Sequence, residues 1–161
     1  MVDADSDREV LIAIRDSLRT NLTDARQQYT NETRTWIHLD KPLTSATYPR
    51  IQVRKRGPST SLIEDIGPEF LERRIMILDV QFWTAQNFKW KQTDNTYLQD
   101  EELCKEWLHR IWVKLKADLL PLRDNYGITG LKMIDEEDPY LEPDTQLYTG
   151  TVSIRAWYFR T

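Results

Sequence analysis

Residues 69–85 read EFLERRIMILDVQFWTA and alternate in polarity over a long stretch of the chain. Successive side chains of a strand point to opposite faces of a sheet, so this pattern predicts one long strand. The expected first face is apolar and holds Met76, Leu78, Val80 and Phe82; the second holds Ile75, Ile77, Asp79, Gln81 and Trp83. Because residues 75–78 are apolar on both faces, we expect them to be covered from two sides, in part by another subunit.

Two amphipathic helices are predicted on either side of this strand. Ser6 has the spacing to Glu9 of a capping box, and apolar residues then recur at helical intervals in a helix that ends near Tyr29. Asp100 is the expected cap of a second helix, which Pro121 stops. The apolar stripes are Val10, Leu11, Ile14, Leu18 and Leu22 in the first helix, and Leu103, Trp107, Leu108, Ile111, Leu115 and Leu119 in the second.

Further strands are predicted at residues 33–40, 48–57, 128–134 and 147–160. In YPRIQVRKRG, residues 48–57, Ile51 and Val53 share one face, and the other holds Arg50, Gln52, Arg54 and Arg56. Loops are expected around Pro42, over residues 57–68, and over the acidic residues 135–144; residues 87–96 form a loop or hairpin tip. This order predicts a single α+β domain, residues 1–161 with a polar lead 1–6, in which two main helices pack on one face of a mostly antiparallel sheet.

The composition bounds the classes of protein that fit. A net charge of −4 argues against a general nucleic-acid binder, because such proteins carry an excess of Lys and Arg. Cys104 is the only cysteine, which excludes an internal disulfide and a cysteine-built metal site. The first residues, MVDADSDREV, lack the basic and apolar regions of a secretory signal, and no apolar run approaches the roughly 20 residues that span a bilayer. We therefore expect a soluble protein without a membrane partner.

Groups suited to catalysis are sparse in the sequence. His38 and His109 are the only histidines and lie in no recognisable motif, and five glycines provide no phosphate-binding loop. The acidic residues 135–144 lack the alternating spacing and central glycine of a calcium loop, so a solvated loop is the simpler interpretation. We predict no enzyme, no metal site and no cofactor.

The segments VLIAIRDSL (10–18), YPRIQVRKRG (48–57), MILDVQFWTA (76–85), LCKEWLHRIWVKL (103–115) and YTGTVSIRAWYFR (148–160) occur in an order that resembles the tail terminator, or tail completion, proteins of long-tailed viruses and prophages. The resemblance covers nearly the whole chain. It implies a virion protein, made in the host cytoplasm, that forms a ring, usually a hexamer. Such a ring stops growth of the tail tube and docks onto the neck of the filled capsid.

The implied partners are further copies of the chain, the tail tube protein and a neck or head-completion protein. Genomic DNA would pass through the bore without specific binding. Two alternatives remain: an adjacent neck or head-completion adaptor, and, from a different class, a small nucleic-acid-binding protein that uses the basic strand 50–56.

The arginines of the basic strand have three possible roles. A ring subunit meets its neighbour through two unlike patches, so Arg50, Arg54 and Arg56 can face Asp135, Glu136, Glu137 and Asp138 of the next copy. They can also form a solvated edge that resists strand aggregation, or line the bore and contact DNA. The aromatic residues Phe88 and Trp90, in a polar loop, are the candidate contacts to another partner.

Overall fold

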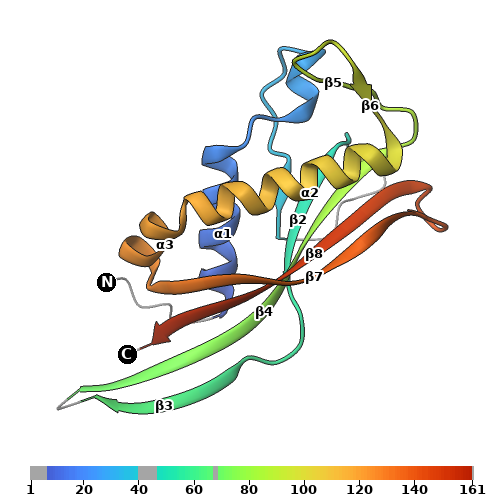
Figure 1. Ribbon diagram of the computed structural model, residues 1–161. Helices are drawn as coiled ribbons and strands as arrows, with labels where there is room; N and C mark the ends of the chain where they lie inside the picture. Colours follow the sequence, from blue (N-terminus) through green and yellow to red (C-terminus); the bar gives the residue numbers. More distant parts are fainter. Residues whose placement is uncertain (1–6, 40–46, 67–68, 161) are drawn as a thin grey trace.

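The computed structural model describes residues 7–39, 47–66 and 69–160, with the backbone alone for residues 61–66, 69–71 and 160 (Figure 1). The predicted cap Ser6 and the predicted loop around Pro42 lie outside the described residues. The helices are α1 (Asp7–Asn21), the 3-10 helix η1 (Ala25–Gln28), α2 (Asp100–Ala117) and α3 (Leu119–Tyr126). The strands are β1 (Ile37–His38), β2 (Arg50–Lys55), β3 (Thr60–Ile66), β4 (Glu69–Ala85), β5 (Trp90–Lys91), β6 (Tyr97–Leu98), β7 (Ile128–Glu142) and β8 (Leu147–Arg160).

Strand β4 organises the main sheet, whose strands lie in the order β1-β2-β4-β8-β7. On one side β4 pairs with β8 from Glu72 to Ala85. Its other side is shared, because β2 pairs with residues 78–83 and β3 with residues 69–75. All of these pairings are antiparallel except that of β1 with β2, and the helices pack against the sheet (Figure 1). The predicted α+β class with a mostly antiparallel sheet is confirmed.

The core lies between the helices and the apolar face of β4. Met76, Leu78, Val80 and Phe82 are fully buried, as predicted, and the α2 stripe packs over them. Burying one such side chain contributes about 1.5–3 kcal/mol. Gly150 lets α2 approach β8 closely, because a Cβ there would lie 2.8 Å from Leu108 Cδ1. The second face of β4 is also buried at Asp79, Gln81 and Trp83, where the neighbours are mainly polar residues of β2 and β8.

Several element boundaries differ from the sequence-based expectations. Helix α2 has Gln99 instead of Asp100 as its N-cap residue and ends at Ala117, and Pro121, expected to stop it, lies in the separate helix α3. Helix α1 ends at Asn21 instead of near Tyr29, and Asp24 then caps the separate helix η1. Residues 60–66, expected in a loop, form β3, because the first part of β4 offers them a partner strand. Residues 135–142, also expected in a loop, continue β7 along β8, with register shifts near Asp135 and Pro139. A proline is accepted there because β7 is an edge strand with shifted register.

Asp7, in the first turn of α1, ties that helix to the sheet. Its carboxylate accepts hydrogen bonds from the Lys55 ammonium and the Tyr158 hydroxyl, and from Ser59 Oγ at 3.1 Å. Burial raises the pKa of Asp7, but these hydrogen bonds outweigh burial, so the pKa lies below its ordinary value. Burial and the Asp7 carboxylate together raise the pKa of Tyr158 to about 12.

The lowered pKa of Asp7 predicts a pH-dependent contribution to stability. A carboxyl whose pKa is lower in the folded than in the unfolded state contributes fully above its unfolded pKa, and this contribution is lost as the pH falls through the folded pKa. Asp7→Asn should therefore lower the free energy of unfolding at neutral pH and make less difference at about pH 2. Urea unfolding at both pH values checks this, with the exposed Asp124→Asn as control; equal effects of Asp7→Asn at both would contradict it.

Candidate assembly surfaces

The basic edge of the molecule consists of Arg54 at the end of β2 and Arg56 just after it. Both side chains are about half exposed, at 51% each, and both reach the buried carboxylate of Asp79 on β4. Arg54 Nη2 lies 3.5 Å and Arg56 Nε 3.4 Å from Asp79 Oδ2, while Ser153 Oγ donates to Asp79 Oδ1 at 2.7 Å. Strand β1 pairs with only Ile51 and Gln52, so it leaves this end of β2 uncovered. The two guanidinium groups are thus held in place and still open to solvent.

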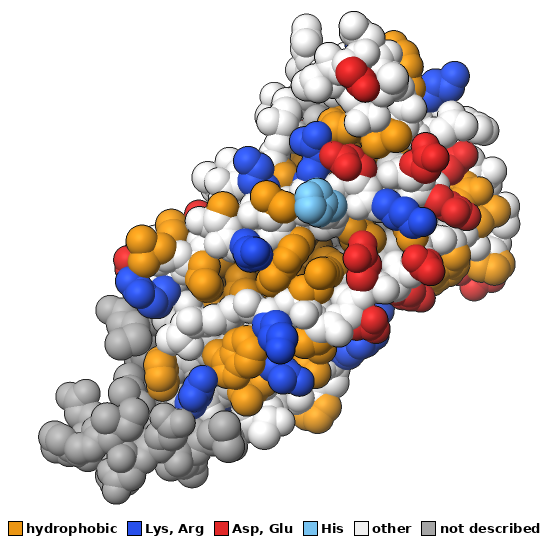
Figure 2. Space-filling model, in the orientation of Figure 1, with side chains coloured by type: hydrophobic (Ala, Val, Ile, Leu, Met, Phe, Trp, Pro, Cys, Tyr) orange, Lys and Arg blue, Asp and Glu red, His pale blue; other side chains and the backbone are white. Residues whose placement is uncertain are grey.

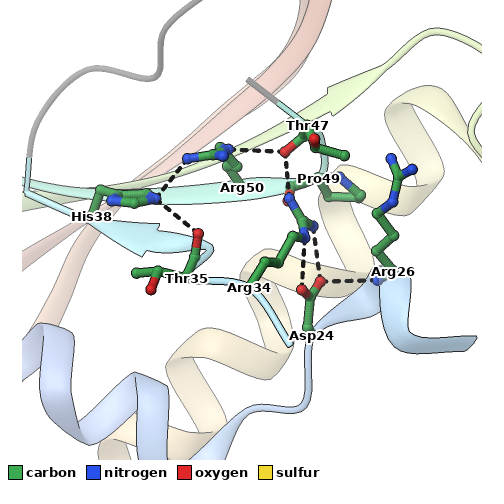
Figure 3. Close-up of polar contacts among 8 residues, drawn as sticks. All are labelled: Asp24, Arg26, Arg34, Thr35, His38, Thr47, Pro49 and Arg50. Carbon is green, nitrogen blue, oxygen red and sulfur yellow. Dashed lines mark hydrogen bonds and ion pairs between the residues drawn. The ribbon is translucent and has the colours of Figure 1, made fainter. Parts of the chain in front are cut away.

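Arg50, predicted to belong with Arg54 and Arg56, lies at the other end of β2 in a separate polar cluster (Figure 3). Its Nε donates to the Thr47 carbonyl at 2.8 Å, and its Nη1 lies 2.7 Å from His38 Nε2. Burial and the nearby Arg34 lower the pKa of Arg50. Because these contacts hold Arg50 at the start of β2, away from Arg54 and Arg56, we assign Arg50 to the support of β2 instead of to the basic edge.

The cluster in Figure 3 is centred on the buried ion pair of Asp24 and Arg34. Arg34 Nε and Nη2 donate to the two Asp24 carboxylate oxygens at 2.7 and 2.9 Å. Arg34 also donates to the carbonyls of Thr47 and Pro49. These contacts join the segment after α1 to the segment that leads into β2, and so they fix where β2 begins.

The acidic edge consists of Asp135, Glu136, Glu137 and Asp138 on β7. All four side chains are exposed, and none forms an ion pair with another residue in the described part of the chain. Among the described strands β7 pairs with β8 alone, so its outer side has no strand partner. Ile134, Tyr140 and Leu141 are exposed apolar residues of the same strand. This edge therefore combines charge with apolar surface.

The two edges lie at opposite sides of one sheet. In register, Arg54 is opposite Asp79, Asp79 is opposite Ser153, and Ser153 is opposite Asp135. Three interstrand spacings of about 4.8 Å separate the backbones of Arg54 and Asp135 by roughly 14 Å. Arg54 instead contacts Asp79, which lies between them. The sequence prediction did not identify Asp79 as a partner of the arginines, because that requires the register between β2 and β4.

The aromatic residues predicted to contact a partner pack against their own chain. Trp90, in β5, is buried and lies edge-on to Trp107, with ring centroids 5.6 Å apart. Phe88 is partly buried and lies edge-on to Tyr29 at 5.7 Å. The more exposed aromatic residues here are Tyr29 and Tyr97, which the sequence prediction did not select.

Comparisons with known proteins do not assign this chain to a family. Neither a scan against protein-family models nor a search of curated proteins finds a match to this chain. Within the described residues, no group of His, Cys, Asp and Glu side chains has the geometry of a metal site. None of the helices in those residues has the length and apolar character needed to cross a membrane.

Proposed function

We propose that this protein is a ring-forming structural subunit of a virus tail, a tail terminator that caps the tail tube and joins it to the head or neck. The observation that carries the proposal is the pair of unlike charged edges at opposite sides of one sheet. Closed rings are built from head-to-tail contacts between two different patches of each copy. The resemblance of the sequence to tail terminator proteins supplies the role of such a ring.

The charges at the two edges suit a contact between neighbouring copies. Arg54 and Arg56 carry two positive charges against one negative charge on Asp79, so the basic edge keeps an excess of positive charge. The four carboxylates of the acidic edge have no described ion-pair partner in their own chain. Exposed pairs contribute only about 0–1 kcal/mol each, so the exposed apolar residues of β7 would supply much of the remaining stabilisation.

The same geometry suits an adjacent neck or head-completion adaptor, since it would also form a ring. A nucleic-acid-binding role for strand 50–56 has less support, because Arg50 is held by His38 and Thr47 at the other end of β2, which leaves Arg54 and Arg56 as the basic edge. The position of the protein in an image of the assembled particle distinguishes terminator from adaptor. Particles that lack the protein should have tails of incorrect length or tails unjoined to capsids.

The double substitution Glu136→Lys and Glu137→Lys is expected to prevent ring formation. It places two ammonium groups opposite Arg54 and Arg56 of the next copy, and like charges at an interface are destabilising. Size-exclusion chromatography with light scattering should show a wild-type oligomer that dissociates as salt rises, and a monomeric variant. Adding Arg56→Glu to the same chain should restore part of the oligomer.

The matched control is Glu101→Lys with Asp124→Lys, which makes the same change of net charge at exposed positions on α2 and α3. The control should assemble like the wild type. Reversal at Arg54 is a less informative change than reversal at Arg56, because residue 54 is the direct strand partner of the buried Asp79, whereas Arg56 lies just beyond β2 and only its side chain reaches Asp79. A wild-type chain that stays monomeric both alone and on purified tail tubes would refute the proposal, as would normal assembly of the acidic-edge variant.

A further inference from the structure

A second surface, independent of the two edges, lies where the segment after α1 crosses beside β5 and α2 (Figure 1). Two hollows flank residues 22–27 there, with volumes of about 390 and 430 Å³. They share the lining residues Leu22, Thr23, Asp24 and Gln27, so the two hollows lie on the two sides of one short segment. We call the two hollows together the α1–α2 groove. Each hollow has room for one or two side chains of a guest.

The lining of the groove is cationic although the chain as a whole is acidic. Arg19 and Arg34 line one hollow, and Arg110 and Lys114 line the other. Asp24 lines both hollows, and neither lining contains another acidic residue. Both carboxylate oxygens of Asp24 already accept hydrogen bonds from Arg34. Positive charge in the groove is therefore not balanced by the groove itself.

Two of these cations, Arg110 and Lys114, have capacity for a guest anion. Lys114 has no ion pair with any other described residue, and Arg110 uses Nε for Glu106 at 3.0 Å. Arg19 is already engaged, because it donates through Nε and Nη2 to the Ile37 carbonyl at 3.0 and 2.6 Å, and its Nη1 lies 3.8 Å from Asp16 Oδ1. Burial and the nearby Arg15 lower the pKa of Arg19, and the Asp16 carboxylate acts in the opposite direction.

The walls of the groove are fixed before any guest arrives. Gln28 Nε2 donates to the Lys91 carbonyl at 2.8 Å, and the Lys91 amide donates to Gln28 Oε1 at 2.8 Å, so β5 is locked to η1. The Arg110 guanidinium stacks on Trp90, 4.6 Å from the ring centroid. Trp36 and Trp107, one from each hollow, meet edge to face at 5.3 Å. A preformed site loses less conformational entropy when it binds.

We propose that the α1–α2 groove binds a short acidic peptide segment of a partner protein, whose carboxylates lie beside Arg110 and Lys114 in the hollow that these two residues line. Two features favour a short peptide over a nucleic acid. The hollows have the size of side chains, and acidic residues gather nearby over the first half of α2, at Asp100, Glu101, Glu102 and Glu106, and toward the tip of the β7–β8 hairpin (Figure 2). A long polyanion would be repelled by that surface, whereas a short segment stays within the groove.

The test uses a blocked synthetic hexapeptide with Glu and Asp at its centre, and the same peptide with Gln and Asn in their place. Tryptophan fluorescence and calorimetry at low ionic strength should show saturable binding of the acidic peptide and none of the neutral one. Lys114→Gln and Arg110→Gln should each weaken binding about fivefold, which corresponds to the loss of one exposed ion pair. Lys116→Gln is the matched control, because Lys116 is exposed on the same helix but lines neither hollow. It should bind like the wild type.

Several outcomes would overturn the inference. These are absence of saturable binding, equal binding of the neutral peptide, and unchanged affinity in both Lys114→Gln and Arg110→Gln. The inference would also be overturned if inorganic phosphate or a thymidine oligonucleotide displaced the peptide at a concentration below that of the peptide. The groove would then prefer phosphate to carboxylate. Both substituted side chains are exposed, so thermal unfolding should show that the variants fold.

Discussion

Replacement of Trp107 by alanine should lower the free energy of unfolding by about 3–5 kcal/mol, the range for removing a large aromatic side chain from a core. Trp107 is buried at the centre of an aromatic cluster formed by α2, β4, β5 and the residue before β1. Its ring stacks on Phe82 with centroids 5.6 Å apart and an interplanar angle of 1°. It also lies edge-on to Trp36 at 5.3 Å and to Trp90 at 5.6 Å. One substitution therefore removes contacts that join four segments of the chain.

Urea unfolding followed by circular dichroism measures this loss, and the melting temperature should fall by roughly 6–20 °C. Trp112→Ala is the matched control: the same residue type on the same helix, but only partly buried. It should cost less than half as much. If Trp107→Ala does not fold, Trp107→Phe keeps part of the cluster and should show a smaller loss. Equal losses at positions 107 and 112 would contradict the central role of Trp107.

The sequence predicted the core well where periodicity is strong. Residues 76–82 alternate over a long stretch, and the stripe of α2 recurs at helical spacing from Leu103 to Leu115. Both patterns arise because one face must be buried, so they carry information about burial as well as about local conformation. The faces predicted for these segments are the buried faces in the structure.

Local polarity did not predict the edge strands. Residues 60–66 lie in a stretch, 57–68, with the Gly, Pro and Ser content typical of loops, and residues 135–142 are acidic and contain proline. Both are nevertheless extended, because a long neighbouring strand offers them backbone partners. An edge strand needs no apolar alternation when little of its surface is buried. Helix α1 was predicted too long for a related reason, since polar residues after Leu22 neither continue nor exclude a helical pattern.

The candidate assembly surfaces depended on facts that a sequence does not contain. The opposite charges of Arg54 and Glu136 are visible in the sequence, but their positions at opposite sides of one sheet follow from strand order. The same strand pairing shows Asp79 as the internal partner of Arg54. The sequence grouped Arg50 with Arg54 because alternate residues of a strand share a face. In the structure the two side chains lie at different ends of β2, and Arg50 contacts Thr47 and His38 instead.

Asp24→Ala should lower the free energy of unfolding by about 3–5 kcal/mol, the cost of leaving one charge of a buried ion pair without its partner. The Asp24 and Arg34 side chains are 4% and 12% exposed, so the guanidinium would remain largely dehydrated after the substitution. The change also removes the hydrogen bond from the Arg26 amide that caps η1, at 2.9 Å. Arg34, no longer held by Asp24, would then fix Thr47 and Pro49 less firmly.

Urea unfolding of Asp24→Ala, Arg34→Met and the double variant forms a cycle that tests this account. If the cost comes from an unpaired buried charge, the double variant should be more stable than Asp24→Ala, because it removes the guanidinium as well. Asp124→Ala is the control, since its pair with Arg123 is more than half exposed and should change stability by less than about 1 kcal/mol. Strictly additive losses in the cycle would show that Asp24 and Arg34 act independently, and the ion pair would then not explain how the start of β2 is held.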